Sequence, residues 1–164
     1  MYRIDILKKL FSNKVNINQY LRKKTNLSEK DIIKLSYDIQ SGSYIKSYNY
    51  NYAKSKRVLN SVIKEINSTN YKTLMDFGCG ELTNFYTLMR NIKTKSKVFI
   101  CYDLSFSRIL VGKNFLKKKI KIQKKKIQLK CFSNNSIKIP LPDNSIDLVT
   151  SCHSLEPNKT NDNK

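Results

Sequence analysis

Two glycines and one aspartate give the clearest chemical signal in this sequence. Gly78 and Gly80 follow an apolar run that ends at Phe77 and precede a helix-like stretch that begins at Thr83. Glycines at such a junction let a ligand approach the backbone closely, and the exposed amides of a helix start favour negative groups. Asp103 ends the next apolar run, where a carboxylate can accept both hydroxyls of a ribose. Together these features predict a binding site for a ribose-containing ligand.

The glycine pair by itself is a weak signal. A tight strand-to-helix turn also uses glycine, and no third glycine completes the dinucleotide-binding pattern Gly-x-Gly-x-x-Gly. The prediction of a ligand site becomes stronger because Asp103 occurs together with the two glycines.

Short apolar runs alternate with helix-like stretches from residue 71 onward. We expect strands at residues 73–77, 97–102, 127–132 and 146–151, and helices at residues 83–89 and 105–116. Strands separated by helices indicate a parallel, doubly wound sheet. The sequence therefore predicts an α/β fold with an incomplete sheet of about four strands.

The residues before the sheet are predicted to be helical. Apolar side chains recur at helical spacing in residues 1–11, after the capping residue Ser28, and in residues 52–66. We therefore expect an N-terminal helical segment over residues 1–70, the sheet-bearing half of a domain over residues 71–157, and a polar tail over residues 158–164.

The glycine region resembles the first motif of the class I S-adenosylmethionine-dependent methyltransferases, which has the form Asp-x-Gly-x-Gly-x-x-Thr. Asp76, Gly78, Gly80 and Thr83 match it in order. The resemblance implies a Rossmann-like sheet and S-adenosylmethionine as the cofactor. It also implies roles for individual residues: Gly78, Cys79 and Gly80 would line the methionine part, Asp76 would contribute nearby, Asp103 would bind the ribose, and Leu104 would flank the adenine.

A second block strengthens this resemblance. Residues 139–149 are similar to the Leu-Pro-Phe-Pro-Asp-x-Ser-Phe-Asp-x-Val segment that leads into the fourth strand of small-molecule methyltransferases related to quinone-biosynthesis enzymes. The resemblance implies that Ser151, just beyond this block, lies at the cofactor. Such relatives carry Gly-Asp after the third strand, where this chain has Asn134 and Asn135, whose amides would hydrogen-bond the adenine. Both blocks disfavour a nicotinamide-binding oxidoreductase.

An upstream segment is similar to a further element of these enzymes. Residues 37–44 have the form Tyr-Asp-x-Gln-x-Gly-x-Tyr, which in some relatives closes over the cofactor, and this implies that Tyr44 reaches it. A helix that ends before Gly42 explains the same residues equally well.

Methyl transfer of this kind asks little of side chains, because it is an in-line displacement favoured by alignment of the acceptor. A base helps only where the acceptor must lose a proton. His153, the single histidine, follows the fourth expected strand and is the candidate base, and Glu156 could assist it. A structural role at the start of a helix is the stronger interpretation of both residues.

The charge of the chain is strongly positive. Lysine and arginine total 32 against 12 acidic residues, for a formal net charge of +20. Only five of the basic residues are arginine, the type that favours bidentate phosphate recognition, and the lysine-rich residues 113–130 lack aromatic groups at their centre. We interpret the charge as a solubility feature. A basic module that binds nucleic acid or a partner chain is the alternative function.

The four cysteines, Cys79, Cys101, Cys131 and Cys152, are too widely spaced for a Cys-x-x-Cys zinc or redox pair. Each falls on or just after an expected strand, so small buried side chains are expected rather than a metal site. No apolar run is long enough to span a membrane, and residues 1–11 lack a signal-peptide cleavage site. These features favour a cytoplasmic protein without disulfides.

The resemblance covers residues 38–157 and stops after the fourth of the seven strands that the class I fold normally has. The fourth strand would then be an exposed apolar edge. A truncated product is the first explanation, and half of a split enzyme completed by another chain or a self-associating remnant are the others. The predicted function is methyl transfer to an unidentified small-molecule acceptor, with activity of the chain by itself in question.

Overall fold

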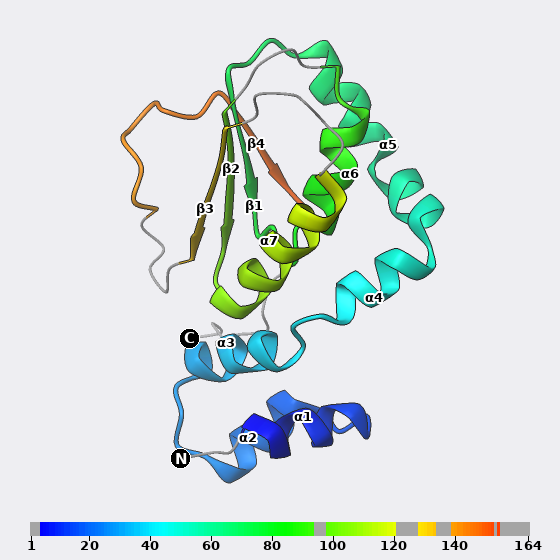
Figure 1. Ribbon diagram of the computed structural model, residues 1–164. Coiled ribbons are helices and arrows are strands. Elements are labelled where there is room, and N and C mark those ends of the chain that lie inside the picture. The colour runs from blue at the N-terminus through cyan, green and yellow to red at the C-terminus, as the bar shows by residue number, and fades with distance from the viewer. Residues whose placement is uncertain (1–3, 94–97, 121–127, 134–138, 153, 155–164) are drawn as a thin grey trace.

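The computed structural model describes residues 4–93, 98–120, 128–133, 139–152 and 154. Helices and strands alternate in its second half, as expected, and a run of helices precedes them (Figure 1). In chain order the elements are α1 Ile4–Ser12, α2 Ile17–Lys24, α3 Glu29–Ile39, α4 Ser43–Tyr50, α5 Tyr52–Ser68, β1 Thr73–Phe77, α6 Thr83–Asn91, β2 Val98–Asp103, α7 Phe106–Ile120, β3 Gln128–Ser133 and β4 Leu148–Ser151.

The four described strands form one all-parallel sheet in the order β3-β2-β1-β4. The chain moves outward from β1 to β2 and β3, then crosses back to place β4 on the other side of β1. Ligands bind beyond the carboxyl ends of the strands where such a reversal occurs. The predicted α/β fold with a four-strand parallel sheet is therefore confirmed, and its topology favours a site at the ends of β1 and its neighbours.

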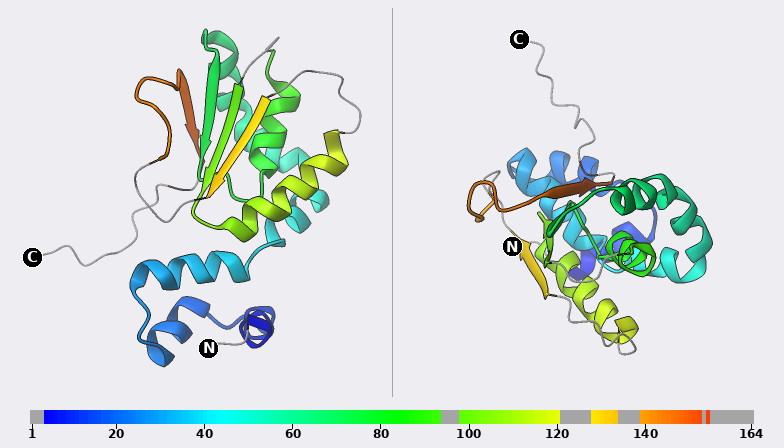
Figure 2. Two further views of the ribbon diagram at one scale, coloured as in Figure 1. Left: turned by 60° about the vertical axis from the view of Figure 1, so that its left-hand side comes forward. Right: turned by 90° about the horizontal axis from the view of Figure 1, so that it is seen from above.

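Helices α5, α6 and α7 cover one face of the sheet (Figure 2). The main core lies between them and the strands, and Phe85 of α6 packs edge-to-face on Phe99 of β2 with ring centroids 5.5 Å apart. On the opposite face, residues 139–146 supply Ile139, Leu141 and Ile146, which pack against Met75 and Ile100. The block that resembled the approach to a fourth strand therefore also covers the far face of the sheet.

The fourth strand begins two residues later than expected because Asp147 is used as an anchor. Its Oδ2 atom accepts hydrogen bonds from the backbone amides of Lys72 (2.9 Å) and Thr73 (2.7 Å), at the start of β1. This fixes the register in which Leu148 pairs with Leu74. Within the described sheet β4 is an edge strand, and the apolar residue Val149 on it is 55% exposed. This agrees with the expectation that the fourth strand forms an exposed apolar edge.

Helices α1, α2 and α3 form a smaller core of their own around Leu7, Leu21 and Ile32. Ser28 caps α3 as predicted: its Oγ accepts from the Asp31 amide at 3.2 Å and donates to the Asp31 carboxylate at 2.6 Å. Helix α3 lies across the end of the sheet toward which the strands point (Figure 1). The N-terminal helices therefore stand at the edge where a ligand is expected. Among the described residues there is no helix long and apolar enough to cross a membrane.

Candidate functional site at the carboxyl ends of β1 and β2

The loop after β1 turns sharply because two of its glycines adopt left-handed backbone angles. Gly78 has φ +72° and Gly80 has φ +52°, a region that glycine enters without steric cost. The amides of Gly78 and Cys79 both donate to the Tyr102 carbonyl of β2, at 2.7 and 3.0 Å. The loop is thus fastened to the neighbouring strand, and helix α6 begins directly after it.

Each of these two glycines also allows another part of the chain to approach. A Cβ atom at Gly78 would overlap the side chain of Ser154, whose hydroxyl donates to the Phe77 carbonyl at 3.0 Å. A Cβ atom at Gly80 would lie 2.8 Å from Nη2 of Arg108. A side chain at either position would therefore displace its neighbours as well as strain the backbone.

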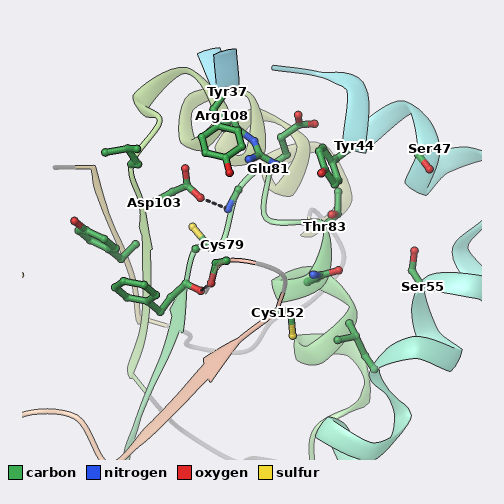
Figure 3. Close-up of a pocket in the computed structure, with 18 of the residues that line it drawn as sticks. Tyr37, Tyr44, Ser47, Ser55, Cys79, Glu81, Thr83, Asp103, Arg108 and Cys152 are labelled. Carbon is green, nitrogen blue, oxygen red and sulfur yellow. Dashed lines mark hydrogen bonds between the residues drawn. The ribbon is translucent and has the colours of Figure 1, made fainter. Parts of the chain in front are cut away.

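Asp103 connects the end of β2 to the glycine loop. The carboxylate is 6% exposed, and its Oδ2 atom accepts a 2.7 Å hydrogen bond from the Gly80 amide (Figure 3). Its Oδ1 atom accepts from the Ser105 amide at 2.9 Å, at the start of α7. Two backbone donors hold the side chain in one orientation, and each carboxylate oxygen keeps a further lone pair for a ligand hydroxyl.

A cavity of about 940 Å³ opens at this end of the sheet. Its size lies in the range of small-molecule and cofactor sites. Six of the residues predicted from the sequence line it, namely Tyr44, Gly78, Cys79, Gly80, Asp103 and Leu104. Ser151 is not among the residues that line the cavity and hydrogen-bonds instead to Ser154 through its hydroxyl. Asn134, Asn135 and His153 lie outside the described residues.

Asp76 is placed inside the sheet rather than on the cavity wall. Its side chain is 2% exposed, one oxygen accepts from the Thr150 hydroxyl at 3.1 Å, and Oδ2 has no hydrogen-bond partner among the described residues. Burial raises the pKa of this carboxyl to about 7, and the nearby Asp103 carboxylate adds to the effect. Asp76 therefore couples the first strand to β4 through Thr150.

Glu81 is a site residue that sequence analysis missed. The side chain is 1% exposed, and its two oxygens accept from the amides of Gly42 (2.8 Å) and Ile45 (2.9 Å). These amides belong to the start of α4, where a negative charge is favourable. Glu81 thereby ties the junction of α3 and α4 to the glycine loop. Its position directly after Gly80 was the only available signal, because its partners are distant in sequence.

Arg108 is the second missed residue. Its guanidinium lies over the rings of Tyr37 and Tyr44, with its Cζ atom 5.2 and 4.7 Å from their centroids. All three residues line the cavity (Figure 3). The segment 37–44 therefore does two things: it turns after α3 at Gly42, which has φ +99°, and it brings both tyrosines to the cavity.

Three of the cysteines are neighbours at the glycine loop, β2 and β3, and the described residues contain no group of side chains that could hold a metal ion. Cys101 pairs in register with Cys131 across β2 and β3, and Cys79 lies beside Cys101. Burial raises the pKa of the Cys79 thiol, so this residue is a neutral part of the cavity wall.

Comparison with one solved structure supports the fold. An assigned S-adenosyl-L-methionine-dependent methyltransferase from Methanococcus maripaludis superposes with a TM-score of 0.51 at 17% identity, over 68% of this chain and 48% of that one. A SAM-dependent methyltransferase from Aquifex aeolicus gives a TM-score of 0.45 at 20% identity, over 60% and 55% of the two chains. This chain thus spans about half the length of the Methanococcus protein.

A comparison with curated proteins finds no match. The model of the family described as "Methyltransferase domain" matches residues 75–161, which include the glycine loop, Asp103 and the block before β4. Family and fold together confirm the prediction of a methyltransferase domain built on a parallel α/β sheet. The chain belongs to the methyltransferase-domain family.

Proposed function

We propose that this chain binds S-adenosylmethionine in the cavity at the carboxyl ends of β1 and β2 and transfers its methyl group to a small-molecule acceptor. One observation carries the proposal. In a member of the methyltransferase family, the carboxylate of Asp103 and the glycine loop meet at 2.7 Å on the wall of one cavity. These are the two features from which the sequence predicted a ribose-binding site.

The residues around the cavity fit the parts of the cofactor. The buried Asp103 carboxylate offers free lone pairs to the ribose hydroxyls. Phe77 and Tyr102, whose stacked rings have centroids 5.2 Å apart, and Leu104 provide apolar surface for the adenine. The loop of Gly78 and Gly80 contributes backbone to the cavity wall, beside the side chains of Ser154 and Arg108. When bound, the cofactor supplies a methyl group on a positively charged sulfur, an electrophile ready for in-line transfer.

The contribution of the chain to this reaction is alignment and exclusion of water. Glu81 fixes the junction of α3 and α4 to the glycine loop, and the Ser105 hydroxyl donates to the Asp38 carboxylate, which ties α3 to α7. These contacts hold a wall of the cavity over the expected methyl donor. Holding the acceptor in line with the methyl group lowers the barrier to a reaction of this type, because little orientational freedom remains to be lost.

The acceptor would lie against the wall formed by α4 and α5. This wall combines the polar residues Ser47, Asn51 and Ser55 with the apolar residues Val58 and Val62. Such a mixture suits a small molecule with a few polar groups. His153 stays a candidate base for an acceptor that must lose a proton, beside the structural role that the sequence favours. A cytoplasmic location stays a prediction from the sequence.

Calorimetric titration of the purified, monodisperse chain tests the proposal. We expect saturable binding of S-adenosylmethionine and of S-adenosylhomocysteine, with one site for each chain. NAD provides a control that shares the adenosine portion and should bind far more weakly. A folded chain that binds neither sulfur nucleoside would overturn the proposal.

A further inference from the structure

Arg108 is a nearly buried cation whose donors are not matched by an anion. Its side chain is 9% exposed, and the Nε atom has no hydrogen-bond partner among the described residues. Within the same residues no carboxylate forms an ion pair with it. A guanidinium carries five N–H donors and cannot lose its proton, so burial without partners is costly.

The two tyrosine rings contact Arg108 without accepting hydrogen bonds from its N–H groups. The Cζ atom of Arg108 lies over the rings of Tyr37 and Tyr44, at 5.2 and 4.7 Å from their centroids. Such contacts stabilise the charge, while the N–H donors point outward in the plane of the group. The rings therefore contact the guanidinium at the cavity without accepting hydrogen bonds from its N–H donors.

The neighbouring carboxylates already serve other donors. Asp103 accepts from two backbone amides, Glu81 accepts from two others, and Asp38 accepts from the Ser105 hydroxyl. Each of these groups has a structural task at the loop or at the α3–α4 junction. The cavity thus contains a positioned cation while its own acidic groups are engaged elsewhere.

We propose that Arg108, held by Tyr37 and Tyr44, is an anion-binding group of the cavity that receives a carboxylate of a bound ligand. This proposal rests on the proposed function. A planar carboxylate matches the planar fork with two parallel hydrogen bonds. Two ligands could provide it: the amino-acid end of the cofactor, favoured by the closeness of Arg108 to Gly80, or an acidic acceptor molecule.

The test compares ligands that differ in the amino-acid portion. S-adenosylhomocysteine carries the carboxylate, whereas 5′-methylthioadenosine keeps the adenosine and the sulfur but lacks it. Both are titrated into the full chain and into the Arg108→Met variant by calorimetry. Arg57→Met is the matched control, because Arg57 is exposed on α5 and does not line the cavity. Arg108→Lys, which keeps the charge without the planar fork, serves if Arg108→Met does not fold.

If the cofactor supplies the carboxylate, Arg108→Met lowers the affinity for S-adenosylhomocysteine by about tenfold or more. The affinity for 5′-methylthioadenosine stays within about twofold of the wild-type value. Arg108→Lys shows a smaller loss for the same ligand, and Arg57→Met shows none. This pattern supports the proposal and assigns the carboxylate to the cofactor.

If the acceptor supplies the carboxylate, Arg108→Met leaves the affinities for both nucleosides unchanged. Benzoate, a simple aromatic carboxylate, then raises the melting temperature of the wild type saturated with S-adenosylhomocysteine but not that of Arg108→Met. If Arg108→Met changes none of these three readouts, Arg108 only packs against the tyrosines and the proposal is overturned. If the folded wild type binds neither nucleoside, the proposed function fails. The benzoate comparison is then made on the wild type and Arg108→Met without nucleoside, and an equal benzoate effect on both proteins overturns the role of Arg108.

Discussion

Replacing Asp103 by asparagine tests the reasoning about the site most directly. The substitution keeps the shape of the side chain and removes its charge. In the wild type both carboxylate oxygens accept backbone hydrogen bonds, from the Gly80 amide at 2.7 Å and the Ser105 amide at 2.9 Å. Asparagine offers only one acceptor oxygen, so one of these buried amides would face the NH₂ group of the new side chain.

The expected loss can be worked from these contacts. A hydrogen bond to a charged group contributes about 1.5 to 3 kcal/mol to the free energy of unfolding. For a chain of this size, a loss of that magnitude lowers the melting temperature by about 3 to 12 °C. The ribose hydroxyls would also lose a charged acceptor, so the affinity for S-adenosylhomocysteine should fall by about tenfold or more.

Thermal unfolding and calorimetry measure the two effects separately. Asp143→Asn removes the same charge from an exposed position outside the cavity and should change neither quantity. An Asp103→Asn protein with wild-type melting temperature and unchanged affinity would refute both the anchoring role and the ribose-binding role of Asp103. A lower melting temperature with unchanged affinity would leave Asp103 as a purely structural residue.

Three further outcomes are expected. Because the folded-state pKa of Asp76 is raised to about 7, its contribution to stability is greatest below pH 4 and is lost as pH rises toward 7. Asp76→Asn should therefore make the melting temperature depend less on pH over that interval. A pH profile like that of the wild type would contradict the burial argument. Gly78→Ala should weaken binding of S-adenosylhomocysteine and lower stability, because φ is +72° and the new Cβ would overlap Ser154. Gly42→Ala meets only the backbone strain of φ +99° and should lower stability less. Equal losses of stability in denaturant titrations would rule out the Ser154 contact as a cause. Glu81→Gln should accelerate hydrogen exchange at the amides of Gly42 and Ile45, whereas the control Glu65→Gln, at an exposed position, should not. Amides that stay protected in Glu81→Gln would mean that the α3–α4 junction does not depend on this carboxylate.

Most elements of the fold could be predicted because each has a local signal. The apolar run 73–77 and the following glycines locate β1 and its turn, and Ser28 with Asp31 marks the start of α3. Boundaries were less accurate. The fourth strand was expected from residue 146, but Ile146 packs on the far face and Asp147 binds the start of β1, so β4 begins at Leu148.

Part of the site could also be predicted, since the sequence motif that resembles the family contains the loop residues themselves. Gly78, Gly80 and Asp103 line the cavity at the carboxyl ends of β1 and β2. Asp76 belongs to the same motif and is nevertheless buried within the sheet, because it lies inside β1, ahead of the loop, and accepts a hydrogen bond from Thr150 of β4. A motif identifies which residues are near a site without stating which of their side chains face it.

What the sequence alone determined is therefore the local chemistry: an alternation of strands and helices, a glycine turn, and an acidic residue at the end of the second strand. The tertiary structure decided which distant groups meet there. Glu81 accepts from the amide of Gly42, and Arg108 lies between tyrosines of α3 and α4, because the N-terminal helices fold across the carboxyl ends of the strands. Local spacing sets secondary structure through short-range sterics and hydrogen bonds, whereas contacts between remote residues depend on how the whole sheet and its helices pack.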